Sequence, residues 1–92
     1  MRKIEKEMLN AVNTGTNWAK ANTQVVHING IAQVFLHGNH IASIYGEPEA
    51  NIETLKAWPS RTTQSRLWAL GINVYQRKGL VYLNDEPIAE AW

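Results

Sequence analysis

The dipeptide Asn29-Gly30 separates two apolar runs, Val25–Ile28 and Ile31–Leu36, and it restricts the possible folds more than any other feature of the sequence. Asn-Gly is the preferred loop of a two-residue β-hairpin, because both positions take a positive φ. A second turn, His37-Gly38-Asn39-His40, leads into a third apolar run, Ile41–Tyr45. These runs predict a three-stranded antiparallel meander.

Alternation along this meander, which covers residues 23–45, assigns its side chains to two faces. If Asn29-Gly30 and Gly38-Asn39 are the turns, one face carries Val25, Val34, Leu36 and Ile41. The other face carries Val26, Phe35 and Ile44. Because both faces are apolar, we expect helices on one of them and more chain or a partner on the other.

Two segments have the signals of helices. Residues 2–13 place apolar side chains at helical spacing: Ile4, Met8, Leu9 and Val12. The second helix follows Pro59, begins with hydroxyl side chains that can cap it, and stops at Gly71. Its periodicity places Thr63, Leu67, Leu70 and Val74 on one face and Arg61, Ser65 and Trp68 on the opposite face. We therefore expect the leucines to enter a core, and the two arginines, Arg61 and Arg66, to face solvent together with hydroxyls and the indole.

The remaining segments are assigned by local composition. Residues 13–17 predict a turn, residues 18–23 a loop, residues 46–51 an acidic loop and residues 52–58 an extended segment. Short strands are expected at residues 73–76, 80–83 and 88–92, with turns at Arg77-Lys78-Gly79 and at Asn84-Asp85-Glu86-Pro87. The predicted fold class is α+β, with an antiparallel sheet and two α-helices in a single domain, residues 1–92.

Composition excludes several classes of function. The chain has no cysteine, which rules out disulfides and thiolate chemistry. His27, His37 and His40 lack acidic neighbours in the sequence, so we expect neither a metal nor another cofactor. No phosphate loop or nucleophile elbow is present, and we expect no enzymatic activity and no small-molecule substrate. Without a signal or membrane-spanning segment, the expected location is the cytoplasm, away from membranes.

Charge favours a binding protein with a local contact site. The net charge is +1. A DNA mimic needs a strongly acidic surface, and a protein that binds nucleic acid by bulk charge needs a large basic excess, so both classes are excluded. The candidate partner- or RNA-binding residues are Arg61, Arg66, Trp68, Arg77 and Lys78. Arginine forms bidentate hydrogen bonds with phosphate, and an exposed indole stacks on a base or fills a pocket in a partner. Because the second helix and the following hairpin are consecutive, these side chains could converge at one end of the fold. For each, the alternative is an ordinary solvated side chain or, for Trp68, a half-buried cover of the core.

Several stretches together resemble a group of small bacteriophage proteins. They are residues 1–9, Asn17-Trp18, Asn22-Thr23, Leu36-His37-Gly38-Asn39-His40-Ile41-Ala42, residues 60–70 and Val74-Tyr75-Gln76. The Leu-His-Gly-Asn turn and the Arg-Thr-Thr-x-Ser-Arg-Leu helix start are the most specific parts. Size and overall sequence are similar to those of a phage anti-CRISPR family directed at the type I-F surveillance complex.

This resemblance implies a non-enzymatic inhibitor. Its partner is the CRISPR ribonucleoprotein surveillance complex, with its Cas protein subunits and crRNA, and binding blocks recognition of target DNA or its hybridisation with the guide. An alternative from another class is a phage-encoded accessory protein that binds single-stranded nucleic acid or RNA on its own. A weaker third alternative is a small hydrolase or nuclease.

Overall fold

The computed structural model describes residues 1–92, which form three helices and two antiparallel sheets. The helices are α1 (Lys3–Thr14), α2 (Ile52–Ala57) and α3 (Arg61–Ala69). The large sheet has the strand order β1 (Trp18–Lys20), β2 (Thr23–Ile28), β3 (Ile31–Leu36), β4 (Asn39–Tyr45), β5 (Glu47–Ala50). The small sheet has the order β6 (Val74–Arg77), β7 (Leu80–Leu83), β8 (Glu86–Glu90). The predicted α+β class is confirmed, with one helix more than expected.

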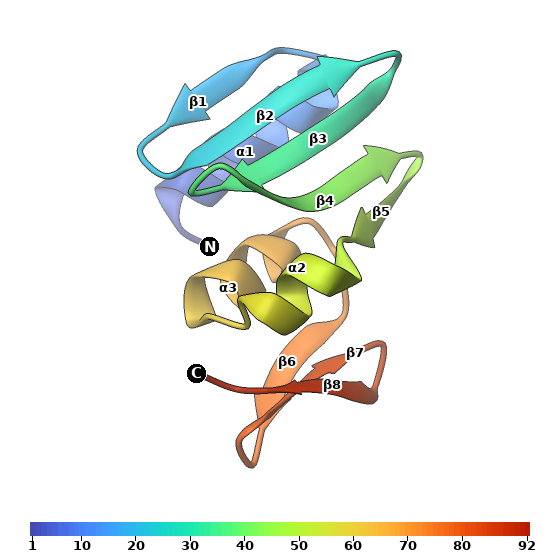
Figure 1. The fold of residues 1–92 in the computed structure, drawn as a ribbon. Coiled ribbons are helices and arrows are strands. Elements are labelled where there is room, and N and C mark those ends of the chain that lie inside the picture. Colours follow the sequence, from blue (N-terminus) through green and yellow to red (C-terminus); the bar gives the residue numbers. More distant parts are fainter.

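The helices α2 and α3 lie between the two sheets, and α1 lies against one face of the large sheet (Figure 1). A cluster of 16 buried apolar residues runs through these layers, from Met8 of α1 through Val34 and Leu67 to Val81 of β7. On the outer face of the large sheet, Phe35 stays half-buried.

Both predicted helices form where their sequence signals place them. α1 buries Met8 and Ala11 and ends at Gly15, whose φ of +69° suits the residue that closes a helix. α3 begins after Ser60, whose hydroxyl accepts a hydrogen bond from the backbone N–H of Thr63 at 3.1 Å. These caps explain why the two boundaries lie within one residue of the predicted ones.

The first turn of the meander is confirmed, whereas the second lies one residue earlier than expected. It is His37-Gly38, so that Leu36 pairs with Asn39. A β-bulge next to Phe35 then shifts the register and turns Ile41 inward, where it is buried. The same shift places Ile44 opposite the buried Ala32, so the prediction that Ile44 lies on the outer face is wrong.

Two predicted loops are in fact edge strands. β1 pairs with β2 along residues 18–20, and β5 pairs with β4 along residues 47–50. The backbone N–H of Asn51 donates to the Ile41 carbonyl at 2.8 Å. Because backbone groups alternate along a strand, the N–H groups of residues 47 and 49 then point toward β4, and the backbone nitrogen of Pro48 points toward the free edge. Proline is tolerated there because no partner strand needs its missing N–H. The sequence Glu47-Pro48-Glu49 predicted a loop because proline and glutamate are uncommon in strands, although the segment forms an edge strand.

The segment after β5 is helical rather than extended as predicted. Asn51 caps α2, since its side-chain oxygen accepts a hydrogen bond from the backbone N–H of Thr54 at 3.1 Å. Leu55 is buried, and it follows Ile52 at the three-residue spacing of a helix. The prediction failed because this spacing was interpreted as imperfect strand alternation.

The C-terminal strands form as expected, although β8 begins earlier than predicted. Asn84 and Asp85 both have a positive φ and make a two-residue turn, which frees Glu86 to pair with Leu83. Trp92 returns to Trp58, with ring centroids 4.9 Å apart. None of the three helices has the length and apolar content that crossing a membrane requires.

Candidate partner-binding site

Arg66, a charged side chain that we expected to face solvent, is buried and only 3% exposed. Its Nε donates to Thr23 Oγ1 at 3.0 Å, and its Nη1 forms an ion pair with Glu5 Oε2 at 2.9 Å. Its Nη2 donates to Asn22 Oδ1 at 3.3 Å. The expectation that Arg66 faces solvent is therefore wrong, because a buried carboxylate on α1 neutralises the guanidinium.

Glu5 holds this buried network together. Besides Arg66 it accepts hydrogen bonds from Ser65 Oγ at 2.6 Å and from the backbone N–H of Arg2 at 3.2 Å. Burial by itself raises the pKa of Glu5, but these hydrogen bonds and the charge of Arg66 outweigh it and hold the pKa below the ordinary value of 4.5. Glu5 is therefore ionised at neutral pH and ties α1 to α3.

Arg61 and Trp68 do lie on the exposed face of α3, as predicted from the periodicity. Trp68 is 62% exposed, whereas Leu67 beside it is fully buried. A hollow of about 580 Å³ lies on one side of the indole and is lined by Met1, Arg2, Glu5, Ser65, Trp68 and Ala69. A second hollow of about 250 Å³ lies against Trp68 and residues 71–73. The indole therefore stands between two depressions that a partner can enter.

The charge beside Trp68 is positive. Neither Arg2 nor Arg61 takes part in either of the two ion pairs of the structure, and both are exposed. Glu5 is the only carboxylate that lines the hollow next to Arg2, and its charge is compensated by Arg66. Arg2 therefore offers a free cation beside the indole, and Arg61 offers a second one on the same face of α3, about two helical turns before Trp68.

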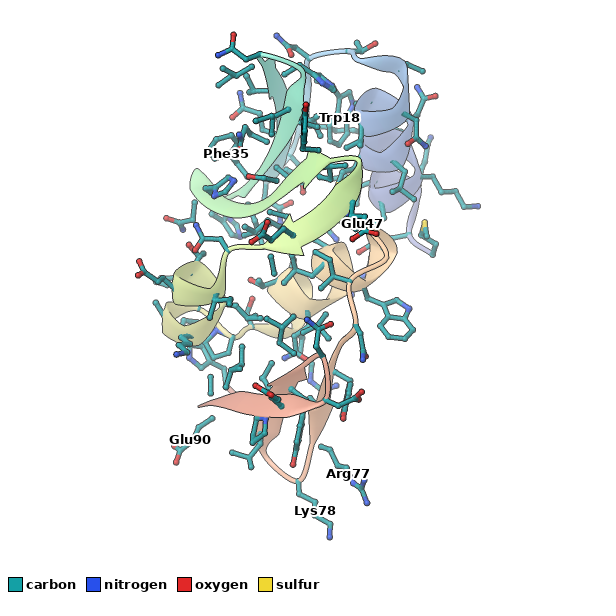
Figure 2. All side chains as sticks on the ribbon, turned by 90° about the vertical axis from the view of Figure 1, so that its right-hand side faces the viewer. Trp18, Phe35, Glu47, Arg77, Lys78 and Glu90 are labelled. Atoms are coloured by element: carbon teal, nitrogen blue, oxygen red, sulfur yellow. The ribbon has the colours of Figure 1, made fainter.

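Arg77 and Lys78 lie elsewhere, at the tip of the β6–β7 hairpin, at the end of the molecule farthest from the large sheet (Figure 2). Arg66 instead contacts the large sheet through Thr23. The five candidate residues therefore do not form one cluster: the structure separates an exposed face of α3, a buried arginine and a hairpin tip.

The hairpin tip adjoins a pair of stacked tyrosines. The rings of Tyr75 and Tyr82 are 5.0 Å apart and inclined by 5°. Tyr75 Oη donates to Asp85 Oδ1 at 3.1 Å; partial burial, this hydrogen bond and the carboxylate charge raise the pKa of Tyr75 above 10.0. The small sheet also carries Glu86 and Glu90, so its acidic side chains outnumber its two cations.

His40 belongs to a hydrogen-bond chain whose direction can be deduced. Asn51 Oδ1 accepts from Thr54, which turns Asn51 Nδ2 toward His40 Nδ1 at 3.0 Å. His40 Nδ1 therefore accepts this hydrogen bond, so the ring proton is on Nε2, which donates to Ser43 Oγ at 2.9 Å. The Ser43 hydroxyl in turn donates to Gln33 Oε1 at 2.7 Å. A serine nucleophile needs the opposite direction, with imidazole accepting the hydroxyl proton. Ser43 is therefore not activated in this arrangement.

The other two histidines do not join His40 in a metal site. His27 Nε2 lies 3.0 Å from the carbonyl oxygen of Ala11, where α1 packs on β2. His37 is exposed in its turn. No group of three or more side chains of the metal-binding types lies close together.

The sequence reasoning missed the two N-terminal residues that shape this site. Arg2 and Glu5 belong to the predicted helix over residues 2–13, but only its apolar residues were assigned a role. The available signal was the position of Glu5 around the helix, where it falls between the apolar residues Val12 and Leu9, together with its spacing of three residues after Arg2. Its partner lies 61 positions away, a separation that no local pattern encodes.

A helix layer between two antiparallel meanders, with an exposed indole between two hollows, defines the chain as a small α+β protein with a solvent-facing helix surface. The family model described as Kyanoviridae Gp96 protein matches residues 1–92. The chain belongs to this family of phage proteins, which confirms the bacteriophage origin implied by the resemblance. Searches among curated proteins and among solved structures find no match.

Proposed function

We propose that this phage protein is a non-enzymatic inhibitor of host CRISPR immunity. It binds the crRNA-guided type I-F surveillance complex in the host cytoplasm and blocks recognition or hybridisation of target DNA. The choice of this complex rests on the sequence resemblance. The structural observation that carries the binding role is the position of Trp68, 62% exposed between two hollows on a helix whose other face is buried.

The physics of interfaces supports this use of α3. Tryptophan and arginine are enriched among the residues that dominate binding energy, particularly beside pockets that exclude water. Leu67 and the buried Arg66 anchor the helix from behind, so the backbone that carries Trp68 has little conformational freedom to lose on binding. The direction of the hydrogen bonds at His40 and Ser43 also favours binding over hydrolysis.

Arg77 and Lys78 remain proposed as a second contact on the same partner. Their hairpin tip is narrow and exposed, which suits a contact with the RNA backbone of a ribonucleoprotein. Two separate contacts fit a large complex better than a short oligonucleotide.

The alternative is a phage accessory protein that binds single-stranded nucleic acid on its own. The stacked Tyr75–Tyr82 pair beside Arg77 is the observation that favours it, because aromatic side chains next to cations bind unstacked bases. Against it, Asp85, Glu86 and Glu90 lie in the same small sheet and repel a phosphate backbone.

A gel-shift experiment distinguishes the two functions. The purified protein is incubated with the assembled type I-F complex and, in parallel, with naked RNA and DNA of the same guide and target sequences. We expect a shift of the complex only, together with loss of target-DNA binding. Tight binding to the naked strands that falls steeply with salt supports the accessory protein instead.

Variants test which surface docks. We expect Trp68→Ala to weaken binding to the complex by about thirtyfold, the usual effect of truncating a central tryptophan. Trp92→Ala is the matched control, since Trp92 is exposed to a similar degree and lies against Trp58 instead. Arg61→Glu and Arg77→Glu are tested separately, because they report on α3 and on the hairpin tip. Unchanged inhibition by Trp68→Ala and Arg61→Glu excludes the α3 face.

A further inference from the structure

The hollow beside Arg2 is one of three that follow each other along the molecule. The hollow beside Arg2 and the one against Gly71 share Trp68. The latter also shares Gly71, Ile72 and Asn73 with a third hollow of about 510 Å³, which is lined by the residues of β5. Together they form a groove along the end of α3 and its connection to β6.

The two ends of this groove have opposite charge. Arg2 lines one end, which holds no uncompensated carboxylate. Glu47 and Glu49 line the other end, and neither forms an ion pair. Glu47 lies on the side of the molecule where α3 runs into β6 (Figure 2). The exposed indole of Trp68 stands between the two ends.

Building on the proposed binding role, we propose that this groove holds an extended protein segment of mixed charge. Its acidic side chains contact Arg2, an apolar side chain packs on Trp68, and its basic side chains contact Glu47 and Glu49. Charge complementarity carries this choice of occupant. A phosphate backbone has one sign along its whole length, so the glutamates at one end disfavour it.

The region beneath the groove is rigid enough to select a partner. Glu5, on the floor of the hollow beside Arg2, is hydrogen-bonded to Ser65, Arg66 and the backbone N–H of Arg2. This network fixes the N-terminal end of α1 relative to α3. The positive end of the groove therefore exists before any partner arrives, and little ordering is needed on binding.

Designed peptides test the occupant without the CRISPR complex, so failure here is distinguishable from failure of the proposed function. A mixed peptide of ten residues has three acidic, four apolar and three basic residues, and it extends to about 33 Å, close to the 37 Å length of the molecule. All-acidic and all-basic peptides with the same apolar centre are the comparisons. A ten-nucleotide uridine oligomer is the nucleic-acid probe.

Binding is followed by the indole N–H and backbone amide signals in ¹H–¹⁵N NMR spectra, with the Trp68 signal assigned from Trp68→Phe. We expect the mixed peptide to bind more tightly than either uniform peptide and to shift Trp68 and Gly71. Combined Glu47→Gln and Glu49→Gln should raise affinity for the all-acidic peptide at least threefold, and Arg2→Gln should do so for the all-basic one. Arg77→Gln is the control and should change neither.

The proposal is overturned if no peptide shifts Trp68, or if the uridine oligomer shifts these signals more than the mixed peptide does. It is also overturned if the combined glutamate variant leaves the affinity for the all-acidic peptide unchanged, or if Arg2→Gln leaves the affinity for the all-basic peptide unchanged. These variants alter exposed side chains, and a well-dispersed spectrum of each shows that the fold persists.

Discussion

At the scale of single residues, the ion pair between Glu5 and Arg66 is the least expected feature of the protein. Both side chains are only 4% exposed, and each of their nitrogen and oxygen atoms has at least one hydrogen-bond partner. Breaking a buried pair leaves an uncompensated charge, whereas replacing both partners removes it. The contribution of the pair is therefore measurable through single and double variants.

We expect Arg66→Met to lower the free energy of unfolding by about 3–5 kcal/mol, because Glu5 stays buried without its cation. The double variant Glu5→Met with Arg66→Met should lose less than the sum of the single variants. Urea unfolding measures each value. Lys20→Met, which breaks the half-exposed pair with Glu7, is the control and should cost no more than about 1 kcal/mol. Additive losses at Glu5 and Arg66 contradict the pairing.

The lowered pKa of Glu5 makes stability depend on acidity. Because the pKa is lower in the folded than in the unfolded chain, the stabilisation is complete well above pH 4.5 and is lost as the pH falls through the folded value. We expect the melting temperature to fall below about pH 4.5 and Glu5→Gln to flatten this dependence. Thermal unfolding followed by circular dichroism between pH 2 and 7 provides the measurement, with Glu7→Gln as control.

Sequence patterns predicted the exposure of a side chain well where that side chain contacts solvent, and poorly where its contact partner is distant in the sequence. Trp68 and Arg61 lie on the exposed face of α3 as the helical period requires. Arg66 does not: at 100° per residue it lies within about 40° of Leu70, beside the apolar face, and its charge alone suggested exposure. Sequence patterns could not report the carboxylate 61 positions away that makes a buried guanidinium stable there. The exposed part of the site was predictable for that reason, and its buried support was not.

At the scale of elements, caps decide where the two short helices begin. Asn51 and Ser60 each accept a hydrogen bond from the third helical backbone N–H, at 3.1 Å in both cases. α2 has six residues, too few for a helix to persist without its cap and its packing. Asn51 additionally holds His40, so its side chain connects α2 to β4.

We expect Ser60→Ala to lower the free energy of unfolding by about 1 kcal/mol, the usual cost of removing a cap. Asn51→Ala should cost more than Ser60→Ala, because it also removes the partner of His40 Nδ1. Urea unfolding of the two variants gives the comparison, with Ser60→Asp as a substitution that retains the cap. Equal or inverted losses mean that the contact with His40 adds nothing.

Element prediction succeeded where two independent local signals agree. Asn29-Gly30 lies between apolar runs, and the α3 start combines a proline with hydroxyl caps; both formed as predicted. The prediction of a loop at β5 was wrong because Pro48 and its glutamate neighbours have a low strand propensity, which the pairing with β4 overrides. The prediction of an extended segment at α2 was wrong because six residues offer only one apolar pair at helical spacing, Ile52 and Leu55, which is too little to reveal a helical period.

At the scale of the whole molecule, positive charge is divided rather than concentrated. The net charge is +1, with free cations on α3 and α1 at one site and at the β6–β7 tip at another. Acidic side chains of β5 and β8 lie between or beside them. A long phosphate backbone therefore meets both signs of charge, and only short contacts are favourable.

This division predicts a shallow salt dependence for any binding to naked single strands. If only Arg77 and Lys78 contact phosphates, log K should fall with log salt concentration with a slope of about −1.4. Combined Arg77→Gln and Lys78→Gln should remove most of that slope, and Arg61→Gln should leave it unchanged. Fluorescence anisotropy with labelled oligouridine at several salt concentrations measures it; a slope several times steeper contradicts the divided charge.

The large sequence separation between Glu5 and Arg66 affects how the chain folds during its synthesis. Every strand pairs only with its neighbours along the chain, so each meander can close as soon as it leaves the ribosome. The carboxylate on α1, however, must wait for 61 more residues, about 3 to 12 s at ordinary translation rates, before its guanidinium exists. Until then α1 has an unmatched charge on the face it will bury, so the N-terminal half of the nascent protein completes its packing only after α3 has been made.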